Sequence, residues 1–295
     1  MTTVEAQASA STLAVASART RPPWWHRVLR SRNLMIGLVI ILLILAIGLL
    51  APVLSSYDPQ KPDYSVIIQA PSLSHPFGTD AFGRDVLTRV MYGARIDLRV
   101  GITAVISPFI IGIILGSLAA YFGGAVETII MRILDIVQAF PFIVLIIAIV
   151  AILGPGLNNM YIAVALTAWV VYARLIRSEI LVQKEQEYVI AAQAMGASNW
   201  RVMLRHLMPN TITSSIVYSM ADIALYILLA ASLSFLGLGA KPPTPEWGAL
   251  ITEGQAYMTT AWWMSTLPGV AIVITGIGLS LIGDGLSDLL RPAGR

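Results

Sequence analysis

The chain has 295 residues, of which 57% are hydrophobic and only 12% are charged, and its mean hydropathy is +0.77. A soluble domain carries roughly 25% charged residues, so this composition excludes an ordinary water-soluble fold and indicates a protein whose solvent is the bilayer. The net charge of +3 comes from basic residues that flank apolar runs, which argues against nucleic-acid binding, and the lack of cysteine excludes disulfides, zinc–thiolate sites and thiol catalysis.

The first predicted elements are a tail and a membrane anchor. Residues 1–25 are rich in Ala, Ser and Thr, and we expect a disordered cytosolic tail. Residues 26–56 are predicted as the first transmembrane helix, because a crossing needs about 20 apolar residues. This run is too long for a cleaved signal peptide, so we expect it to be retained. Arginines before it place the amino terminus in the cytosol by the positive-inside rule: Arg19, Arg21, Arg27, Arg30 and Arg32.

Residues 57–96 are predicted as an outer segment between the first two crossings. Residues 78–99 carry charges at helical spacing, which indicates a structured lid, a docking face for a soluble binding protein or an interfacial helix. The charge-free gap from Arg99 to Glu127 predicts the second crossing.

Residues 97–288 are predicted as the core domain, with two further crossings in its first half. The stretch from Asp135 to Arg174 is too long for one crossing. The sequence GPGLNN at residues 154–159 is a strong turn signal, and it divides the stretch into a third and a fourth crossing.

The fifth crossing is predicted from about residue 211 to residue 236, and the sixth lies between Glu253 and Asp284. Six crossings return residues 289–295 to the cytosol as a short tail. Lys and Arg are then more numerous on the cytosolic side, as the positive-inside rule requires.

A polar segment, residues 187–210, separates the fourth and fifth crossings and is predicted to face the cytosol. Residues 185–195 predict a short helix, and Gly196 permits a sharp bend because it lacks a Cβ. Ser198 is the expected N-cap of a second piece over residues 199–207.

The second piece predicts an amphipathic helix that ends at Pro209. Its apolar residues recur at helical spacing and predict one apolar stripe, opposite Arg201 and Arg205: Trp200, Met203, Leu204 and Leu207. A polar loop with no partner could lie along the membrane surface. The small side chains of Ala191 and Ala192, the glycine and the proline favour a segment that a soluble partner grips.

This segment resembles the cytoplasmic coupling motif of ABC-importer permeases, in which Glu-Ala-Ala is followed four residues later by Gly and then by Pro. Ala191, Ala192, Gly196 and Pro209 occupy the matching positions, while Ile190 replaces the motif glutamate. In the version typical of peptide permeases the segment begins with an acid, here Glu187, and its ending resembles the HLMPN of residues 206–210.

Three further blocks strengthen the resemblance, which covers roughly residues 26–292. HPFGTDAFGRDVLTR at residues 75–89, with YGAR following, is similar to the signature of the second permease subunit of dipeptide, oligopeptide, nickel and glutathione importers. LSFLGLG with PPTPEWG, and the terminal GDGL, resemble two other blocks of that family. The departures from the family pattern are Ala230, Ser280, Ser287 and Arg291.

The resemblance implies an all-α, polytopic membrane protein with six transmembrane helices, the type I ABC-importer permease fold and cytosolic amino and carboxyl termini, in the bacterial cytoplasmic (inner) membrane. It implies inward transport of small peptides, with glutathione or nickel as alternatives. The implied partners are a second homologous permease subunit, two ATP-binding subunits, an extracytoplasmic substrate-binding protein and membrane lipid. The implied ATPase-coupling residues are Glu187, Ala191, Ala192, Gly196, Arg201, Arg205, His206 and Pro209.

No cofactor and no metal site is expected in the chain itself. Its only lysines are Lys61, Lys184 and Lys241, and none follows the Gly-rich run that cradles ATP phosphates. ATP is therefore expected on partner subunits.

Asp222 and Trp169 are candidates for the translocation path. Asp222 is the one acid well inside a predicted crossing, and such a charge is costly to bury. It either contacts a peptide amino group or makes a polar contact in a wet cavity or with a partner subunit. Trp169 either lines the path or packs between helices.

Two rival functions depend on other features. An intramembrane enzyme would need a membrane histidine or a His-Glu-x-x-His motif, whereas His26, His75 and His206 all lie outside the predicted crossings. We therefore expect no catalytic residue. A channel or secondary transporter would work without an ATPase.

Overall fold

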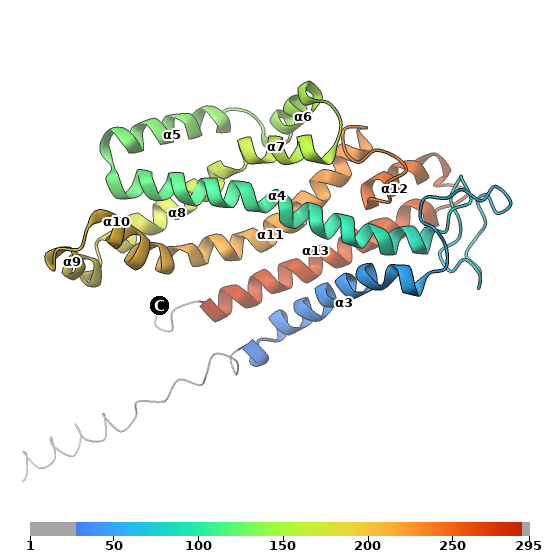
Figure 1. Ribbon diagram of the computed structural model, residues 1–295, viewed down its shortest axis with the longest axis horizontal. Helices are drawn as coiled ribbons and strands as arrows, with labels where there is room; N and C mark the ends of the chain where they lie inside the picture. Colours follow the sequence, from blue (N-terminus) through green and yellow to red (C-terminus); the bar gives the residue numbers. More distant parts are fainter. Residues whose placement is uncertain (1–27, 291–295) are drawn as a thin grey trace, which may run out of the picture.

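The computed structural model describes residues 28–290, and the regular structure in that range is helical apart from one antiparallel bridge between Thr79 and Asp85 (Figure 1). Five of the described helical spans are long and apolar enough to cross a membrane. The pair α5 and α6, bent by 84°, supplies a sixth, in agreement with the predicted number. The predicted tail at residues 1–25 lies outside the described residues, as do residues 291–295.

Helices α3 (Arg32–Leu54) and α13 (Trp263–Leu290) lie side by side along one edge of the bundle (Figure 1). Glycines allow this close approach. A Cβ on Gly37 would lie 2.6 Å from the carbonyl oxygen of Gly278, and one on Gly285 would lie 2.5 Å from the nitrogen of Leu34. The terminal GDGL block is therefore part of a helix–helix contact, as small residues commonly are in membranes.

Helix α4 (Val86–Phe122) begins earlier than the charge pattern predicts. Asp85 caps it by accepting a hydrogen bond from the Thr88 nitrogen at 2.7 Å, and the helix then runs through residue 96 without a break. The expected boundary between residues 96 and 97 thus falls inside a helix. The reason is that Arg89 and Asp97 are buried and bonded within the protein, so charge does not mark the end of this span.

The third crossing also begins earlier than expected, at α5 (Gly124–Gln138), and bends before α6 (Phe142–Leu153). Pro141 stands at the bend, where it disfavours helical backbone in the residue before it. Acidic side chains of α5 pair with arginines of helix α8 (Trp169–Lys184): Glu127 pairs with Arg177, and Asp135 lies 3.6 Å from Arg174.

The predicted turn at residues 154–159 is confirmed. Gly154 and Gly156 adopt φ angles of +94° and +144°, which favour glycine. Asn159 closes the turn by donating from Nδ2 to the carbonyl oxygens of Leu153 and Gly154 at 3.0 and 2.8 Å. Helix α7 (Leu157–Thr167) follows, and a break at Ala168, which the sequence did not predict, separates it from α8 (Trp169–Lys184).

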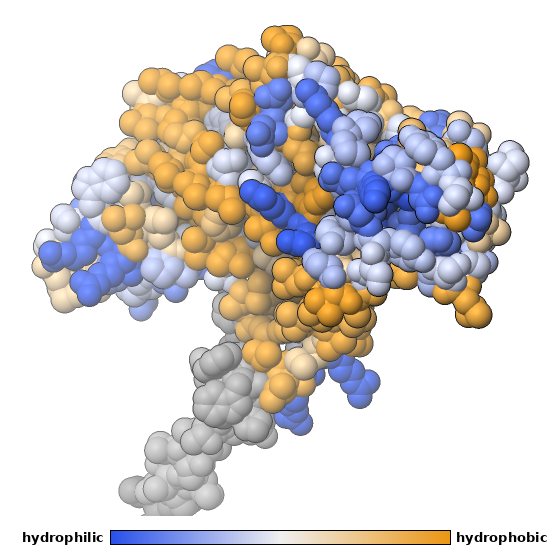
Figure 2. All heavy atoms as spheres, turned by 45° about the vertical axis from the view of Figure 1, so that its right-hand side comes forward, coloured by the Kyte–Doolittle hydropathy of each residue, from blue (hydrophilic) through white to orange (hydrophobic). Residues whose placement is uncertain are grey.

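The remaining described elements sit at the two ends of the bundle (Figure 1). At one end lie α9 (Glu187–Ala194), α10 (Asn199–Arg201) and the π-helical turn η1 (Val202–Leu207), which lead into the crossing helix α11 (Met208–Phe235). At the other end lie the α3–α4 connection, α12 (Trp247–Gly254) and the 3-10 turn η2 (Gln255–Tyr257). Figure 2 shows a broad apolar surface between these two more hydrophilic ends.

Candidate functional site

The α9–α10 hairpin, residues 187–207, turns at Gly196, whose φ of +79° suits glycine. The Gly196 nitrogen donates to the Gln193 oxygen at 2.9 Å, and the Ala197 nitrogen donates to the Ala192 oxygen at 3.1 Å. This pair of bonds is a Schellman ending, which satisfies the last carbonyls of α9. Ser198 then caps α10 by accepting from the Arg201 nitrogen at 3.4 Å, as predicted.

One side of the hairpin is packed against the transmembrane helices. Four of its buried residues share one cluster with Tyr121 of α4 and with Ile176 and Ile180 of α8: Val189, Val202, Met203 and Leu207. The hairpin is therefore part of the packed protein, and not a loop that lies free on the membrane surface.

Tyr121 joins three elements at this point. Its hydroxyl donates to Oδ1 of Asn199 at 3.0 Å, which ties α4 to α10. Its carbonyl oxygen accepts from Nζ of Lys184 at 2.8 Å, and the same ammonium lies 5.3 Å from the Tyr121 ring. Neither Tyr121 nor Asn199 was predicted as a functional residue, because the hydrogen bond between them forms only when the chain is folded.

The outer side of the hairpin is exposed and carries apolar residues beside the charged Glu187, Arg201 and Arg205. Met195 is 81% exposed, and Ile190, Trp200 and Leu204 are also exposed. Trp200 packs edge-on against Phe122, with ring centroids 5.8 Å apart. Ile190, which stands where the family motif has glutamate, thus adds to an apolar surface and not to an acidic one.

The eight expected coupling residues do not all face the same way. Ala192 is buried and His206 is half-buried, and the carbonyl of His206 accepts from Asn210 Nδ2 at 2.7 Å. The other six lie exposed on the hairpin or just after it: Glu187, Ala191, Gly196, Arg201, Arg205 and Pro209.

Two local expectations for the hairpin were wrong. The helix does not stop at Pro209, but passes through the π-helical turn η1 directly into α11, with Pro209 in the first turn of α11. The π turn accommodates the missing N–H of proline. It also changes the spacing, so that Met203 is buried whereas Trp200 and Leu204 are exposed, and the predicted single stripe does not form.

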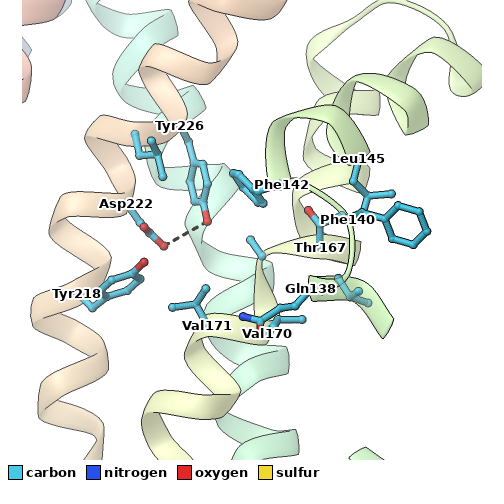
Figure 3. A pocket seen from close by; sticks show the side chains of 13 residues that line it. Gln138, Phe140, Phe142, Leu145, Thr167, Val170, Val171, Tyr218, Asp222 and Tyr226 are labelled. Atoms are coloured by element: carbon cyan, nitrogen blue, oxygen red, sulfur yellow. Dashed lines mark hydrogen bonds between the residues drawn. The ribbon is translucent and has the colours of Figure 1, made fainter. Parts of the chain in front are cut away.

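Asp222 lies in the middle of α11 and is buried, with 4% of its surface exposed. Its Oδ2 accepts hydrogen bonds from the hydroxyls of Tyr172, on α8, at 2.7 Å and Tyr226, one turn further along α11, at 3.2 Å. Asp222 is also one of the residues that line a cavity of about 350 Å³, shown in Figure 3.

The cavity forms where two helix breaks meet α11. Phe140 and Phe142 come from the α5–α6 bend, Thr167 from the end of α7, and Tyr218 and Tyr226 from α11 (Figure 3). Breaks in membrane helices are tolerated where they line a cavity or are buried in protein.

Trp169, the other path candidate, is not brought together with Asp222. It packs in a separate buried cluster with Leu134, Val170 and Ala173, and its Nε1 donates to the Leu166 carbonyl at 3.1 Å. Trp169 is not among the residues that line the Asp222 cavity.

The outer blocks of the sequence form an ion cluster at the end opposite the hairpin. Asp80 accepts from Arg84 at 2.7 Å and from Arg89 at 2.6 Å, and Glu253 accepts from the same two arginines at 2.6 and 2.5 Å. His75 Nδ1 lies 3.0 Å from Asp85, which caps α4. The charges of residues 78–99 therefore fasten the α3–α4 connection to α12.

The last outer loop is held by Glu246, which is fully buried. It caps α12 by accepting from the nitrogens of Gly248 and Ala249 at 2.9 and 2.8 Å, and it accepts from the Ser234 hydroxyl at 2.7 Å. This contact joins the LSFLGLG and PPTPEWG blocks. Among the described residues, no group of three or more His, Cys, Asp or Glu side chains could hold a metal ion.

The crossing helices, the packed hairpin at one end and the cavity at the helix breaks agree with the permease that the sequence predicts. Residues 112–295 match the family model described as the binding-protein-dependent transport system inner membrane component, and residues 23–71 match the N-terminal transmembrane domain of oligopeptide transport permease C. The chain belongs to this family of binding-protein-dependent inner membrane components. The protein is a multi-pass ABC transporter permease of the bacterial inner membrane. Permeases of this family are membrane components and not enzymes.

Several relatives are similar over nearly their whole length. The chain is 41% identical over 273 residues to the dipeptide transport system permease protein DppC of Alkalihalophilus pseudofirmus, covering 92% of this chain and 90% of the relative. It is 42% identical over 276 residues to the glutathione transport system permease protein GsiD of Pectobacterium atrosepticum, covering 92% of each.

A solved structure has the same fold. A chain from the inward-facing methionine ABC transporter MetNI matches with a TM-score of 0.57 and 17% sequence identity, covering 69% of this chain and 97% of that one. The likeness supports the ABC-importer permease fold predicted from the sequence.

Proposed function

We propose that this protein is the second-type permease subunit of an ATP-driven importer of small peptides. It would work with a second homologous permease, two ATP-binding subunits and an extracytoplasmic substrate-binding protein, within the membrane lipid. Peptide is favoured because a relative at 41% identity is named as a dipeptide permease. Glutathione is the second candidate substrate, because relatives at 42% identity carry that name.

The observation that carries the proposal is the α9–α10 hairpin. Its outer side exposes the apolar residues Ile190, Met195, Trp200 and Leu204 beside the charged Glu187, Arg201 and Arg205, which suits the insertion of a short amphipathic helix into a groove of an ATPase. Its inner side is locked to α4 through Tyr121, so that a push on the hairpin would move a crossing helix.

The proposed orientation places the hairpin in the cytosol, where ATP is available. The beginning of α3 and the end of α13 lie at the same end of the bundle as the hairpin (Figure 1). Arg30 and Arg32 stand at the beginning of α3, which agrees with the positive-inside rule for that end.

Reconstitution of the four-subunit importer in liposomes tests this function. With the loaded binding protein on the outside, we expect peptide uptake that requires ATP on the side of the ATPases and that stops when the ATPases are omitted. Uptake at an equal rate without ATPase subunits would show that the chain works as a channel or a secondary transporter.

A further inference from the structure

The cavity at Asp222 has one charged group in otherwise neutral surroundings. Of the described residues that line it, Asp222 alone is charged, and the others are aliphatic, aromatic or neutral polar side chains. A buried carboxylate without a counter-charge is unfavourable, and in a transmembrane segment it marks a functional site by default. No positively charged side chain of the described residues lines the cavity beside Asp222.

The hydrogen bonds of the carboxylate leave one oxygen available. Both tyrosine hydroxyls, from Tyr172 and Tyr226, donate to Oδ2. Oδ1 accepts no hydrogen bond from the described residues. The two tyrosines thus fix the orientation of the side chain, while the second oxygen is left for a ligand that enters the cavity.

We propose that this cavity is a subsite for the primary ammonium group of the transported substrate, an inference that rests on the proposed function. An ammonium carries three donors and one positive charge. Asp222 Oδ1 accepts one of these donors and supplies the opposite charge. The Thr167 hydroxyl lines the same cavity from the end of α7 and donates to the Ala163 carbonyl at 2.8 Å. The rings of Phe142 and Tyr218 also line the cavity, and the faces of aromatic rings attract cations (Figure 3).

The size and charge of the cavity define the ligand further. Its volume of about 350 Å³ lies at the small end of ligand pockets, which run from about 300 to 1,000 Å³. It therefore takes one end of a small peptide and not an extended chain. Asp222 would repel the carboxylate end of a peptide. A metal ion would have only one carboxylate ligand in the cavity, beside tyrosine hydroxyls. The amino end of a peptide is therefore the group that fits.

Asp222→Asn tests the subsite in the reconstituted importer, with two readouts. Asparagine keeps an oxygen that accepts from Tyr172 and Tyr226, but it removes the charge. We expect uptake of a free-amine peptide to fall about tenfold or more. ATP hydrolysis stimulated by the loaded binding protein should stay within about twofold of the unmodified importer, because the coupling hairpin is untouched. Ser219→Ala, which removes a hydroxyl bonded only to its own helix, is the matched control on α11.

A second pair of variants decides the question if Asp222→Asn fails to assemble. Gln138 lines the cavity and points into it (Figure 3). Gln138→Lys places a tethered ammonium near Asp222 that competes with the substrate, and Gln138→Met has a similar length without charge. We expect the lysine variant to lose uptake about tenfold and the methionine variant to keep it.

The outcomes separate this inference from the proposed function. If Asp222→Asn takes up peptide at the unmodified rate, or if Gln138→Lys and Gln138→Met behave alike, the cavity is not an ammonium subsite, although ATP-driven import by the unmodified protein still stands. If the unmodified protein shows no ATP-dependent uptake, the proposed function itself fails.

Discussion

At the scale of single residues, Gly196 is the position where the backbone most clearly limits the side chain. An added Cβ would meet no atom within 4 Å, so a larger residue is not excluded by space. The φ of +79° disfavours β-branched residues instead, because they are strained by about 1–3 kcal/mol in that region.

We predict that Gly196→Val changes the hairpin bend and uncouples transport from ATP hydrolysis, whereas Gly196→Asn keeps coupling, because asparagine tolerates the left-handed conformation. The ratio of peptide taken up to ATP hydrolysed measures this effect in liposomes. Equal ratios for the two variants would mean that the bend does not set the coupling geometry.

Tyr121→Phe tests the link between the hairpin and α4. The change removes the hydrogen bond to Asn199, with a net loss of about 1 kcal/mol, and keeps the packed ring. We expect a lower ratio of uptake to ATP hydrolysis, with normal assembly. Tyr64→Phe is the control, because Tyr64 is 69% exposed in the α3–α4 connection, at the end of the bundle opposite the hairpin. A coupling ratio unchanged in Tyr121→Phe would remove Tyr121 from the transmission path.

At the scale of elements, the contact between α3 and α13 depends on where each glycine points. Gly285 faces the backbone of Leu34, whereas Gly276, on the same helix, has no atom within 4 Å of an added Cβ. We predict that Gly285→Ala destabilises the protein by about 1–3 kcal/mol through overpacking, and that Gly276→Ala is neutral or stabilising by up to about 1 kcal/mol. Thermal unfolding in detergent compares the two, and a lower Tm for Gly276→Ala than for Gly285→Ala would contradict the packing described.

The ion cluster makes a prediction for the α3–α4 connection. Glu253→Gln leaves Arg84 and Arg89 to share Asp80 alone. Since breaking a buried pair is strongly destabilising, we expect faster hydrogen exchange in residues 57–85. Glu185→Gln, at an exposed acid on the hairpin side, should leave that exchange unchanged. Slow exchange in both variants would show that the cluster does not fasten the connection.

The elements also show what a sequence can and cannot predict here. The number of crossings and the turn at Gly154 follow from local signals, namely apolar length and glycine. The beginnings of α4 and α5 do not follow from local signals. The prediction took charged residues as marks of the membrane edge, whereas Arg89, Asp97 and Glu127 form ion pairs or hydrogen bonds inside the fold.

The candidate sites show the same division. The bend at Gly196, the cap at Ser198 and the position of Asp222 inside a crossing helix could be predicted from residue type and position. The partners of Asp222 could not, because Tyr172 lies 50 residues away along the chain. The π turn before Pro209 was also missed, since the periodicity of an α-helix was assumed for the whole segment.

At the scale of the whole molecule, the hairpin and the ion cluster lie at opposite ends of the bundle (Figure 1), and the visible face between the two more hydrophilic ends is apolar (Figure 2). The cavity at Asp222 lies between these ends, on helices α8 and α11, and α8 shares the buried cluster of the hairpin. A movement of the hairpin would thus reach the cavity through continuous packing.

The most direct test of the account is a cross-link from the hairpin. The chain has no cysteine, so Met195→Cys creates a single thiol at a position that is 81% exposed, and Leu73→Cys creates one in the exposed α3–α4 connection. We predict that the thiol at position 195 reacts only from the cytosolic side and cross-links to the ATPase subunit, while the thiol at position 73 reacts only from outside. Labelling of position 195 from outside, or its cross-linking to lipid alone, would contradict the central claim.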